Sequence, residues 1–125
     1  MILENDFYTI SSLTDENGLL NAVLQLNAGH RIFEGHFPGQ PVTPGVCMLQ
    51  MVKELLEKQT GSAARLIIAL EMKFLLMIDP RVNGLIRATL QYAVDETGKA
   101  GVTASLSSEA GVHFKFKGSF QLEAN

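Results

Sequence analysis

Apolar and polar residues alternate over several short stretches of the chain, which is the pattern of half-buried β-strands. The first two stretches, residues 7–13 and 19–26, are separated by a turn sequence that contains Asn17 and Gly18, a strong hairpin signal. Alternation returns after the middle of the chain and continues almost to its end. The later predicted strands cover residues 65–76, 84–94, 100–108 and 112–122.

One segment between the two sets of strands does not alternate and is predicted to be a helix over residues 44–58. Residues 45–52 are apolar almost all round, so we expect this half of the helix to be buried on every side, whereas the second half is amphipathic. Thr43 is predicted to cap the helix, with Pro44 as its first residue. Gly61 is predicted to end it.

These elements predict an α+β fold in which an antiparallel sheet wraps around one long central helix. Short turns join the later strands, and short turns produce antiparallel pairs. The length fits a single domain over residues 1–125. One sheet covers only part of a helix that is apolar on nearly all sides, and a second copy of the chain is the simplest cover for the rest. We therefore expect a homodimer or a higher oligomer.

Composition narrows the class of protein. The formal net charge is −3, which argues against nucleic acid as the main partner. No apolar run is long enough for a transmembrane helix, and the acidic first twenty residues do not resemble a signal peptide. The single cysteine, Cys47, cannot form an internal disulfide and is expected to be a small buried hydrophobic residue. These features predict a cytoplasmic protein without a membrane partner.

The stiffest segment of the chain, GHFPGQPVTPGV, runs from Gly35 to Val46 directly into the predicted helix. Its three prolines and three glycines restrict the backbone or let it approach a ligand closely. His36 stands at its head, and a neutral imidazole can accept a proton near pH 7. The backbone N–H groups at the start of the helix favour negative charge nearby.

This segment resembles the signature loop of the hotdog-fold 3-hydroxyacyl-[acyl-carrier-protein] dehydratases. Ile32-Phe33-Glu34 and Met72-Lys73-Phe74 are also similar to that family, and the order of elements agrees from about residue 19 to 122. The resemblance implies a hotdog fold in which two protomers join their sheets. It further implies a lyase of fatty-acid or polyketide-type biosynthesis that acts on an acyl carrier protein or coenzyme A thioester and needs no cofactor or metal.

The resemblance also implies roles for particular residues. His36 is the base that removes the α-proton of the 3-hydroxyacyl thioester. Gly45 and Val46 supply N–H donors to the resulting oxyanion, and Phe37 and Val42 contribute to substrate binding.

The chain departs from the family at its second catalytic residue, a carboxylic acid that protonates the leaving hydroxyl. Fourteen positions after His36, where the family has this acid, stands Gln50. A carboxamide forms hydrogen bonds but has no titratable proton to give.

Glu54 lies one helical turn beyond Gln50, at a position where the family commonly carries Gln. Residues four apart share a helix face, so one hypothesis is that the acid has moved by one turn and that Glu54 and Gln50 serve the same pocket. The alternative is that Glu54 is an ordinary solvated charge. Both interpretations are open at the level of sequence.

Three functions compete at this level. The first is a dehydratase-like enzyme. The second is a hotdog thioesterase, in which Gln50 or Glu54 positions the attacking water. The third is a catalytically impaired subunit that binds acyl thioesters or supports a catalytic partner, as the loss of the usual acid suggests.

The other polar and sulfur-containing side chains are weaker candidates. His30 is predicted to lie in a surface turn and His113 to face solvent on its strand, and the spacing of the histidines supports no metal site. The methionines at 48, 51, 72 and 77 are expected to fill the core or an acyl pocket. Five basic residues either surround an entrance for an acidic carrier or are scattered surface charges. They are Arg31, Lys53, Lys73, Arg81 and Arg87.

Overall fold

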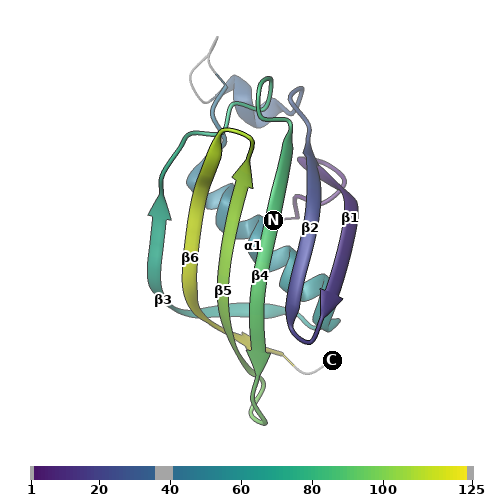
Figure 1. Cartoon of the computed structure of the whole chain (residues 1–125), viewed down its shortest axis with the longest axis vertical. Helices are drawn as coiled ribbons and strands as arrows, with labels where there is room; N and C mark the ends of the chain where they lie inside the picture. The colour runs from purple at the N-terminus through teal and green to yellow at the C-terminus, as the bar shows by residue number, and fades with distance from the viewer. Residues whose placement is uncertain (1, 36–40, 124–125) are drawn as a thin grey trace.

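The computed structural model describes residues 2–35 and 41–123 and consists of one antiparallel sheet with one long helix across one face (Figure 1). This arrangement confirms the α+β architecture predicted from the sequence, including the order of two strands, one helix and four strands. In chain order the elements are β1 (Tyr8–Glu16), β2 (Leu19–Leu26), the 3-10 helix η1 (Arg31–Glu34), α1 (Gly45–Thr60), β3 (Ala64–Phe74), β4 (Leu85–Val94), β5 (Lys99–Ser108) and β6 (Gly111–Leu122).

The strands are arranged in the order β1-β2-β4-β5-β6-β3, and every neighbouring pair is antiparallel. The chain leaves the sheet after β2 and re-enters it at the opposite edge with β3, so α1 crosses behind the sheet in the view of Figure 1. This crossover carries the loop before α1 and the end of β3 to the same side of the molecule.

The turn between β1 and β2 is the hairpin that its sequence predicts. Glu16 pairs with Leu19 around a two-residue loop, and Asn17 and Gly18 both have positive φ values, 53° and 84°. A Cβ atom on Gly18 would lie 2.5 Å from the carbonyl oxygen of Tyr92, so the position needs glycine for space as well as for conformation.

Alternation along β2, β4, β5 and β6 buries one apolar row of each on the face that α1 crosses (Figure 1). In β2, Leu20 and Leu24 are fully buried, and their cross-strand partners on β4, Leu90 and Ile86, are buried too. Burial of such side chains contributes roughly 1.5–3 kcal/mol each. The same face continues through β5 and β6 with Ala100, Val102, Ala104, Leu106, Phe114, Phe116 and Phe120.

The two ends of α1 differ in how well the sequence predicts them. Gly61 follows the last residue in a left-handed conformation, with φ of 70°, and its N–H donates to the carbonyl of Glu57, as expected of a helix stop. At the start, Pro44 rather than Thr43 occupies the N-cap position, and the first helical residue is Gly45. The predicted cap is therefore wrong by one residue, because Thr43 makes no side-chain bond to the helix.

The expectation that the first half of α1 is buried on every side is also wrong for this single chain. Cys47, Met48, Met51 and Val52 are buried, but Val46 is 63% exposed. None of the helices in residues 2–35 and 41–123 has the length and apolar character needed to cross a membrane.

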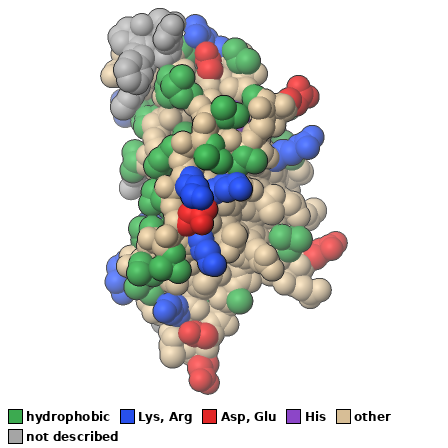
Figure 2. All heavy atoms as spheres, turned by 60° about the vertical axis from the view of Figure 1, so that its left-hand side comes forward, with side chains coloured by type: hydrophobic (Ala, Val, Ile, Leu, Met, Phe, Trp, Pro, Cys, Tyr) green, Lys and Arg blue, Asp and Glu red, His purple; other side chains and the backbone are tan. Residues whose placement is uncertain are grey.

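The exposed side of α1 adjoins β3, an edge strand that is apolar in sequence and yet almost wholly exposed. Leu70 is 66% exposed and Phe74 is 54% exposed, and the segment after the strand continues in the same way to Met77. Figure 2 shows hydrophobic side chains gathered along this side of the molecule, interrupted by a few charged ones. A long apolar edge strand is a ready template for pairing with another chain.

Candidate active site

The loop that carries His36 joins the described structure at Pro41, immediately before α1. His36 and Phe37 themselves lie outside the described residues, so their assigned roles stay predictions. The predicted residues on the helix side of the loop, Val42 and Gly45, lie within the described structure.

A cavity of about 400 Å³ adjoins the N-terminus of α1, between the helix and the end of β3. Pockets for small ligands and cofactors have volumes of about 300–1,000 Å³ and are mostly apolar, and this one fits both criteria. Its lining includes Val42 and Gly45, but not the exposed Val46 side chain. The full lining is Val42, Thr43, Gly45, Met48, Phe74, Leu75, Leu76 and Met77.

Gly45 lets the Phe74 side chain of the cavity wall come close to the helix backbone. A Cβ atom at this position would lie 2.8 Å from Cε1 and 2.9 Å from Cζ of Phe74, closer than side chains approach. The ring of Phe74 therefore rests directly on the helix backbone. The N–H groups of Gly45 and Val46 belong to the first turn, where no intrahelical acceptor exists, and this end of the helix favours negative charge.

The opposite wall of the cavity is held by His113, which was predicted to face solvent and is instead 0% exposed. Its Nδ1 atom is 3.2 Å from the carbonyl oxygen of Leu76, and its own carbonyl accepts the N–H of Leu75 at 2.9 Å. Ser108 Oγ lies 2.6 Å from Nε2 on the other side of the ring. The prediction failed because the segment after β3 folds over this strand position, which alternation cannot reveal.

Thr43 is the most unusual polar group of the cavity. Its side chain is 2% exposed, and its hydroxyl has no hydrogen-bond partner among residues 2–35 and 41–123. The backbone N–H of Thr43 donates to the carbonyl of Ile78 at 2.9 Å, which ties the loop to the segment after β3. The sequence does not single out this hydroxyl, because a threonine before a helix is normally a cap.

Gln50 and Glu54 are joined on one face of α1, as their spacing predicts. The Nε2 atom of Gln50 donates to Oε2 of Glu54 at 2.8 Å. Because a carboxylate only accepts, the amide nitrogen of Gln50 must face Glu54, and the orientation of the amide is thereby fixed. Neither side chain belongs to the lining of the 400 Å³ cavity.

Glu54 is 8% exposed, so its interpretation as a solvated charge is wrong. Besides Gln50, its carboxylate accepts the N–H of Leu3 at 2.8 Å, the N–H of Glu4 at 2.8 Å and the hydroxyl of Tyr8 at 3.1 Å. The three donors from Leu3, Glu4 and Tyr8 attach the N-terminal segment to α1, and Gln50 adds a fourth from the helix itself. They are the usual compensation for a buried charge.

The negative charge of Glu54 affects the pKa values of two neighbouring side chains. Burial, followed by the charge of Glu54 and the hydrogen bond to it, raises the pKa of Tyr8 above its ordinary value. Burial and then the same charge raise the pKa of the Cys47 thiol. A thiol that is fully buried and resists ionisation is a poor nucleophile, which agrees with the expectation that Cys47 is a core residue.

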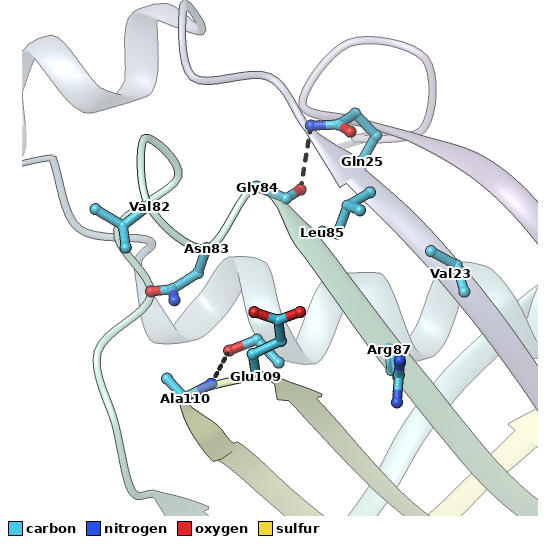
Figure 3. A pocket seen from close by; sticks show the side chains of 10 residues that line it. Val23, Gln25, Val82, Asn83, Gly84, Leu85, Arg87, Glu109 and Ala110 are labelled. Carbon is cyan, nitrogen blue, oxygen red and sulfur yellow. Dashed lines mark hydrogen bonds between the residues drawn. The ribbon is translucent and has the colours of Figure 1, made fainter.

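A larger cavity of about 670 Å³ lies on the outer face of the sheet, away from α1 (Figure 3). It is bounded by β2, β4 and the turn between β5 and β6, and its lining includes Arg87 and Glu109. None of the predicted catalytic or oxyanion residues in the described part of the chain contributes to it. The cavity at the helix terminus, although smaller, is therefore the one that matches the predicted chemistry.

Three of the remaining candidates, His30, Lys73 and Arg81, have side-chain partners. His30 caps η1 by accepting the N–H of Ile32 at its Nδ1 atom, and its Nε2 atom lies 3.0 Å from Asp6, so it is more enclosed than a surface-turn histidine. Arg81 pairs with Asp79 and Lys73 lies 3.6 Å from Glu71. Within residues 2–35 and 41–123, no group of three His, Cys, Asp or Glu side chains is arranged to hold a metal ion.

Two sequence comparisons match this chain to dehydratases. The family model of ApeI-like dehydratases (ApeI dehydratase) matches residues 12–117. A curated relative, the 3-hydroxyacyl-[acyl-carrier-protein] dehydratase FabZ of Aeromonas salmonicida (strain A449), is 39% identical over 54 residues, which are 43% of this chain and 33% of that protein. The match thus spans about a third of the length of this relative.

Solved structures show the same fold at low sequence identity. The dehydratase heterocomplex ApeI:P from Xenorhabdus doucetiae matches with a TM-score of 0.72 at 16% identity, over 88% of this chain and 95% of that chain. The (R)-hydratase from A. caviae involved in PHA biosynthesis matches with a TM-score of 0.64 at 14% identity, over 90% of this chain and 100% of that chain. The protein has the hotdog fold, and because the family model covers most of its length, the chain belongs to the ApeI-like dehydratase family.

Proposed function

We propose that this protein dehydrates a 3-hydroxyacyl thioester, with His36 as the base. The observation that carries the proposal is the apolar cavity at the N-terminus of α1, whose lining includes Val42 and Gly45 of the GHFPGQPVTPGV segment. An acyl chain needs an apolar slot, and the developing negative charge of an enolate needs donors at its oxygen atom. The cavity offers the apolar slot, and the N–H groups at the start of α1 are beside it as possible donors.

The proposed reaction starts at the α-carbon of the acyl group. The thioester carbonyl acidifies the α-proton, His36 accepts that proton, and the N–H groups of Gly45 and Val46 stabilise charge on the carbonyl oxygen. The C–O bond at the third carbon then breaks, and the leaving hydroxide needs one proton to become water. The product is the enoyl thioester.

The source of that last proton is the point at which this chain differs from its family. Gln50 has no proton to give, and each of the four donors around Glu54 already points at a carboxylate oxygen. A protonated Glu54 would direct its own hydrogen against one of them. We therefore propose that Glu54 positions Gln50. The imidazolium formed at His36 donates the proton to the leaving hydroxide.

A relocated acid at Glu54 is the competing hypothesis, and one pair of variants separates the two. His36→Ala should abolish hydration of a crotonyl thioester in either case, because the base is lost. Glu54→Gln should lower the rate by less than about tenfold if Glu54 only positions Gln50, and by about 10²–10⁴-fold if it is the acid. The loss of ultraviolet absorbance of the enoyl thioester follows the reaction, and the folded fraction of each variant is measured beforehand.

A thioesterase is the second candidate, because an amide whose orientation is fixed by Glu54 is suited to hold a water molecule. Release of free thiol from an acyl thioester would indicate this reaction, whereas hydration without thiol release indicates the first. Silence in both assays together with a tight protein partner would indicate a catalytically impaired subunit and would contradict the proposal.

We further propose that a second hotdog chain pairs with the β3 edge, most simply a second copy in a homodimer. The supporting observation is the exposed apolar surface of β3 and Val46 (Figure 2), which lies next to the cavity through Phe74. The relative of known structure is a heterocomplex, so a related subunit is the other occupant to test. Native mass spectrometry of the pure chain should give a dimer. A monomer that dimerises only with a related hotdog chain would favour the heteromeric form.

The thioester carrier is proposed to be an acyl carrier protein, with coenzyme A as the alternative. The support is the partial match to an acyl-carrier-protein dehydratase. The same hydration assay with crotonyl groups on either carrier should give a higher kcat/KM for the protein carrier. Equal values would remove the argument for a carrier-protein surface on this chain.

A further inference from the structure

The buried hydroxyl of Thr43 requires an explanation that residues 2–35 and 41–123 do not provide. Its side chain is 2% exposed, and among the described residues no group donates to Oγ1 or accepts from it. The large majority of buried polar side-chain atoms have a partner, because an unpaired one loses its hydration without compensation. A position of this kind that persists in a packed interior is a candidate for a group whose partner arrives with a ligand.

The surroundings of Thr43 indicate which ligand atom that partner is. Thr43 lines the cavity at the start of α1, two residues before Gly45, and the other side chains of that lining are apolar. The N–H groups of Gly45 and Val46 end at the same helix terminus without intrahelical acceptors. Because Oγ1 is enclosed in the free protein, an oxygen atom bound here would meet the positive end of the helix directly and would reach the hydroxyl after a small shift of the cavity wall.

We propose that the Thr43 hydroxyl donates a hydrogen bond to the carbonyl oxygen of the bound acyl thioester. This inference rests on the proposed function and adds a side-chain donor to its backbone donors. The carbonyl oxygen is a better partner than the 3-hydroxyl, because it gains negative charge during enolisation and the helix terminus favours negative charge. The donated bond strengthens as that charge develops.

Two substitutions separate the hydroxyl from the shape of the side chain. Thr43→Val replaces the hydroxyl by a methyl group at nearly constant volume, and Thr43→Ser keeps the hydroxyl and removes the methyl group. If Oγ1 has no partner in the free protein, Thr43→Val should unfold at a higher denaturant concentration than the wild type. The same substitution should lower kcat/KM for crotonyl-thioester hydration by about 10²-fold, and Thr43→Ser should stay within a few-fold of the wild type.

A binding experiment tests the contact without turnover. The probes are two stable pantetheine compounds of equal chain length: a ketone, in which CH₂ replaces the thioester sulfur, and the same compound without the carbonyl oxygen. Calorimetry should show that Thr43→Val binds the ketone about three- to tenfold more weakly than the wild type. It should bind the compound that lacks the carbonyl with unchanged affinity, and Thr43→Ser should resemble the wild type with both.

The outcomes distinguish this inference from the proposed function. Equal effects of Thr43→Val on both compounds, or no effect on either, would overturn the hydroxyl–carbonyl contact. So would a loss of stability in Thr43→Val, because the hydroxyl would then have a structural partner. A wild-type protein that does not hydrate the enoyl thioester, but whose selectivity for the ketone is lost in Thr43→Val, would overturn the enzyme and support the contact. Binding of neither compound would overturn both.

Discussion

Glu54 and Thr43 are two buried polar side chains on or beside α1, and they differ in their hydrogen-bond partners. The carboxylate of Glu54 receives four hydrogen bonds, three of them from the N-terminal segment. The hydroxyl of Thr43 receives none from the described residues. The fold supplies partners for the first group, and residues 2–35 and 41–123 supply none for the second.

This difference suggests that Glu54 contributes to stability and Thr43 to ligand binding. A charge that is paired on all sides is expected to hold the structure together and to be inert toward ligands. An unpaired hydroxyl beside an apolar cavity and a helix N-terminus costs stability and is expected to contribute to binding. Substitutions at the Glu54 site should therefore change the free energy of unfolding, and those at the cavity should change kcat/KM.

The largest effect on stability is expected for Glu54→Ala. It leaves the N–H groups of Leu3 and Glu4 and the Tyr8 hydroxyl without their acceptor, and should lower the free energy of unfolding by about 3 kcal/mol. Urea unfolding followed by circular dichroism measures this change.

Glu57→Ala is the matched control for that substitution. Glu57 is a glutamate of the same helix that accepts one N–H, from Ala64 at 2.8 Å, so its loss should cost about 1 kcal/mol. Equal losses for the two variants would contradict the claim that Glu54 is the structural centre of the N-terminal segment.

An effect on activity with little change in stability is expected for Gly45→Ala. The new methyl group would push the Phe74 ring into the cavity, because it would lie 2.8 Å from Cε1, and kcat/KM should fall by about tenfold through misplacement of the substrate.

Gly61→Ala provides the opposite control at the other end of α1. No atom lies within 4 Å of a Cβ there, but φ is +70°, so the variant should lose about 1 kcal/mol of stability and keep its activity. An active Gly45→Ala would mean that the Phe74 wall is not part of the site.

The smallest effect is expected for Tyr8→Phe, and it depends on pH. The raised pKa of Tyr8 means that its stabilising contribution is complete below about pH 10, the ordinary value of tyrosine, and is lost as the pH rises further. The variant should be less stable than the wild type by about 1 kcal/mol at neutral pH, and this difference should shrink above pH 10.

Tyr92→Phe calibrates the alkaline series. The pKa of Tyr92 is raised to about 12 by burial and by the hydrogen bond to Asp15, so its contribution should be lost between about pH 10 and 12. A Tyr8→Phe variant whose stability parallels the wild type at all pH values would show that the Tyr8–Glu54 contact is not formed.

The sequence predicts the elements of this molecule well because most of them follow from local rules. Alternation identifies the strands, and Asn17-Gly18 fixes the first hairpin. Positions whose environment comes from a distant segment are predicted poorly. His113 is buried because residues after β3 cover it, and Glu54 is buried because the N-terminal segment docks on α1. Strand alternation and helix periodicity do not indicate the burial of either residue.

The candidate site is predictable in part for the same reason. The loop motif places Gly45 and Val42 at a cavity, which the structure contains. The spacing of Gln50 and Glu54 predicts that they share a helix face, and there they are joined by a hydrogen bond of 2.8 Å. The burial of the Thr43 hydroxyl without a partner among the described residues has no sequence signal. The catalytic roles, the cytoplasmic location and the homodimer stay predictions.

The central claim is that His36 enolises an acyl thioester at the start of α1, and exchange of α-hydrogen for deuterium tests it most directly. A saturated butanoyl thioester has no 3-hydroxyl to lose, so incubation in D₂O reports removal of the α-proton alone. The account predicts deuterium at the α-carbon with the wild-type protein, detected by nuclear magnetic resonance, and none above buffer with His36→Ala. Exchange at the buffer rate with the wild type, or equal exchange by the two proteins, would contradict it.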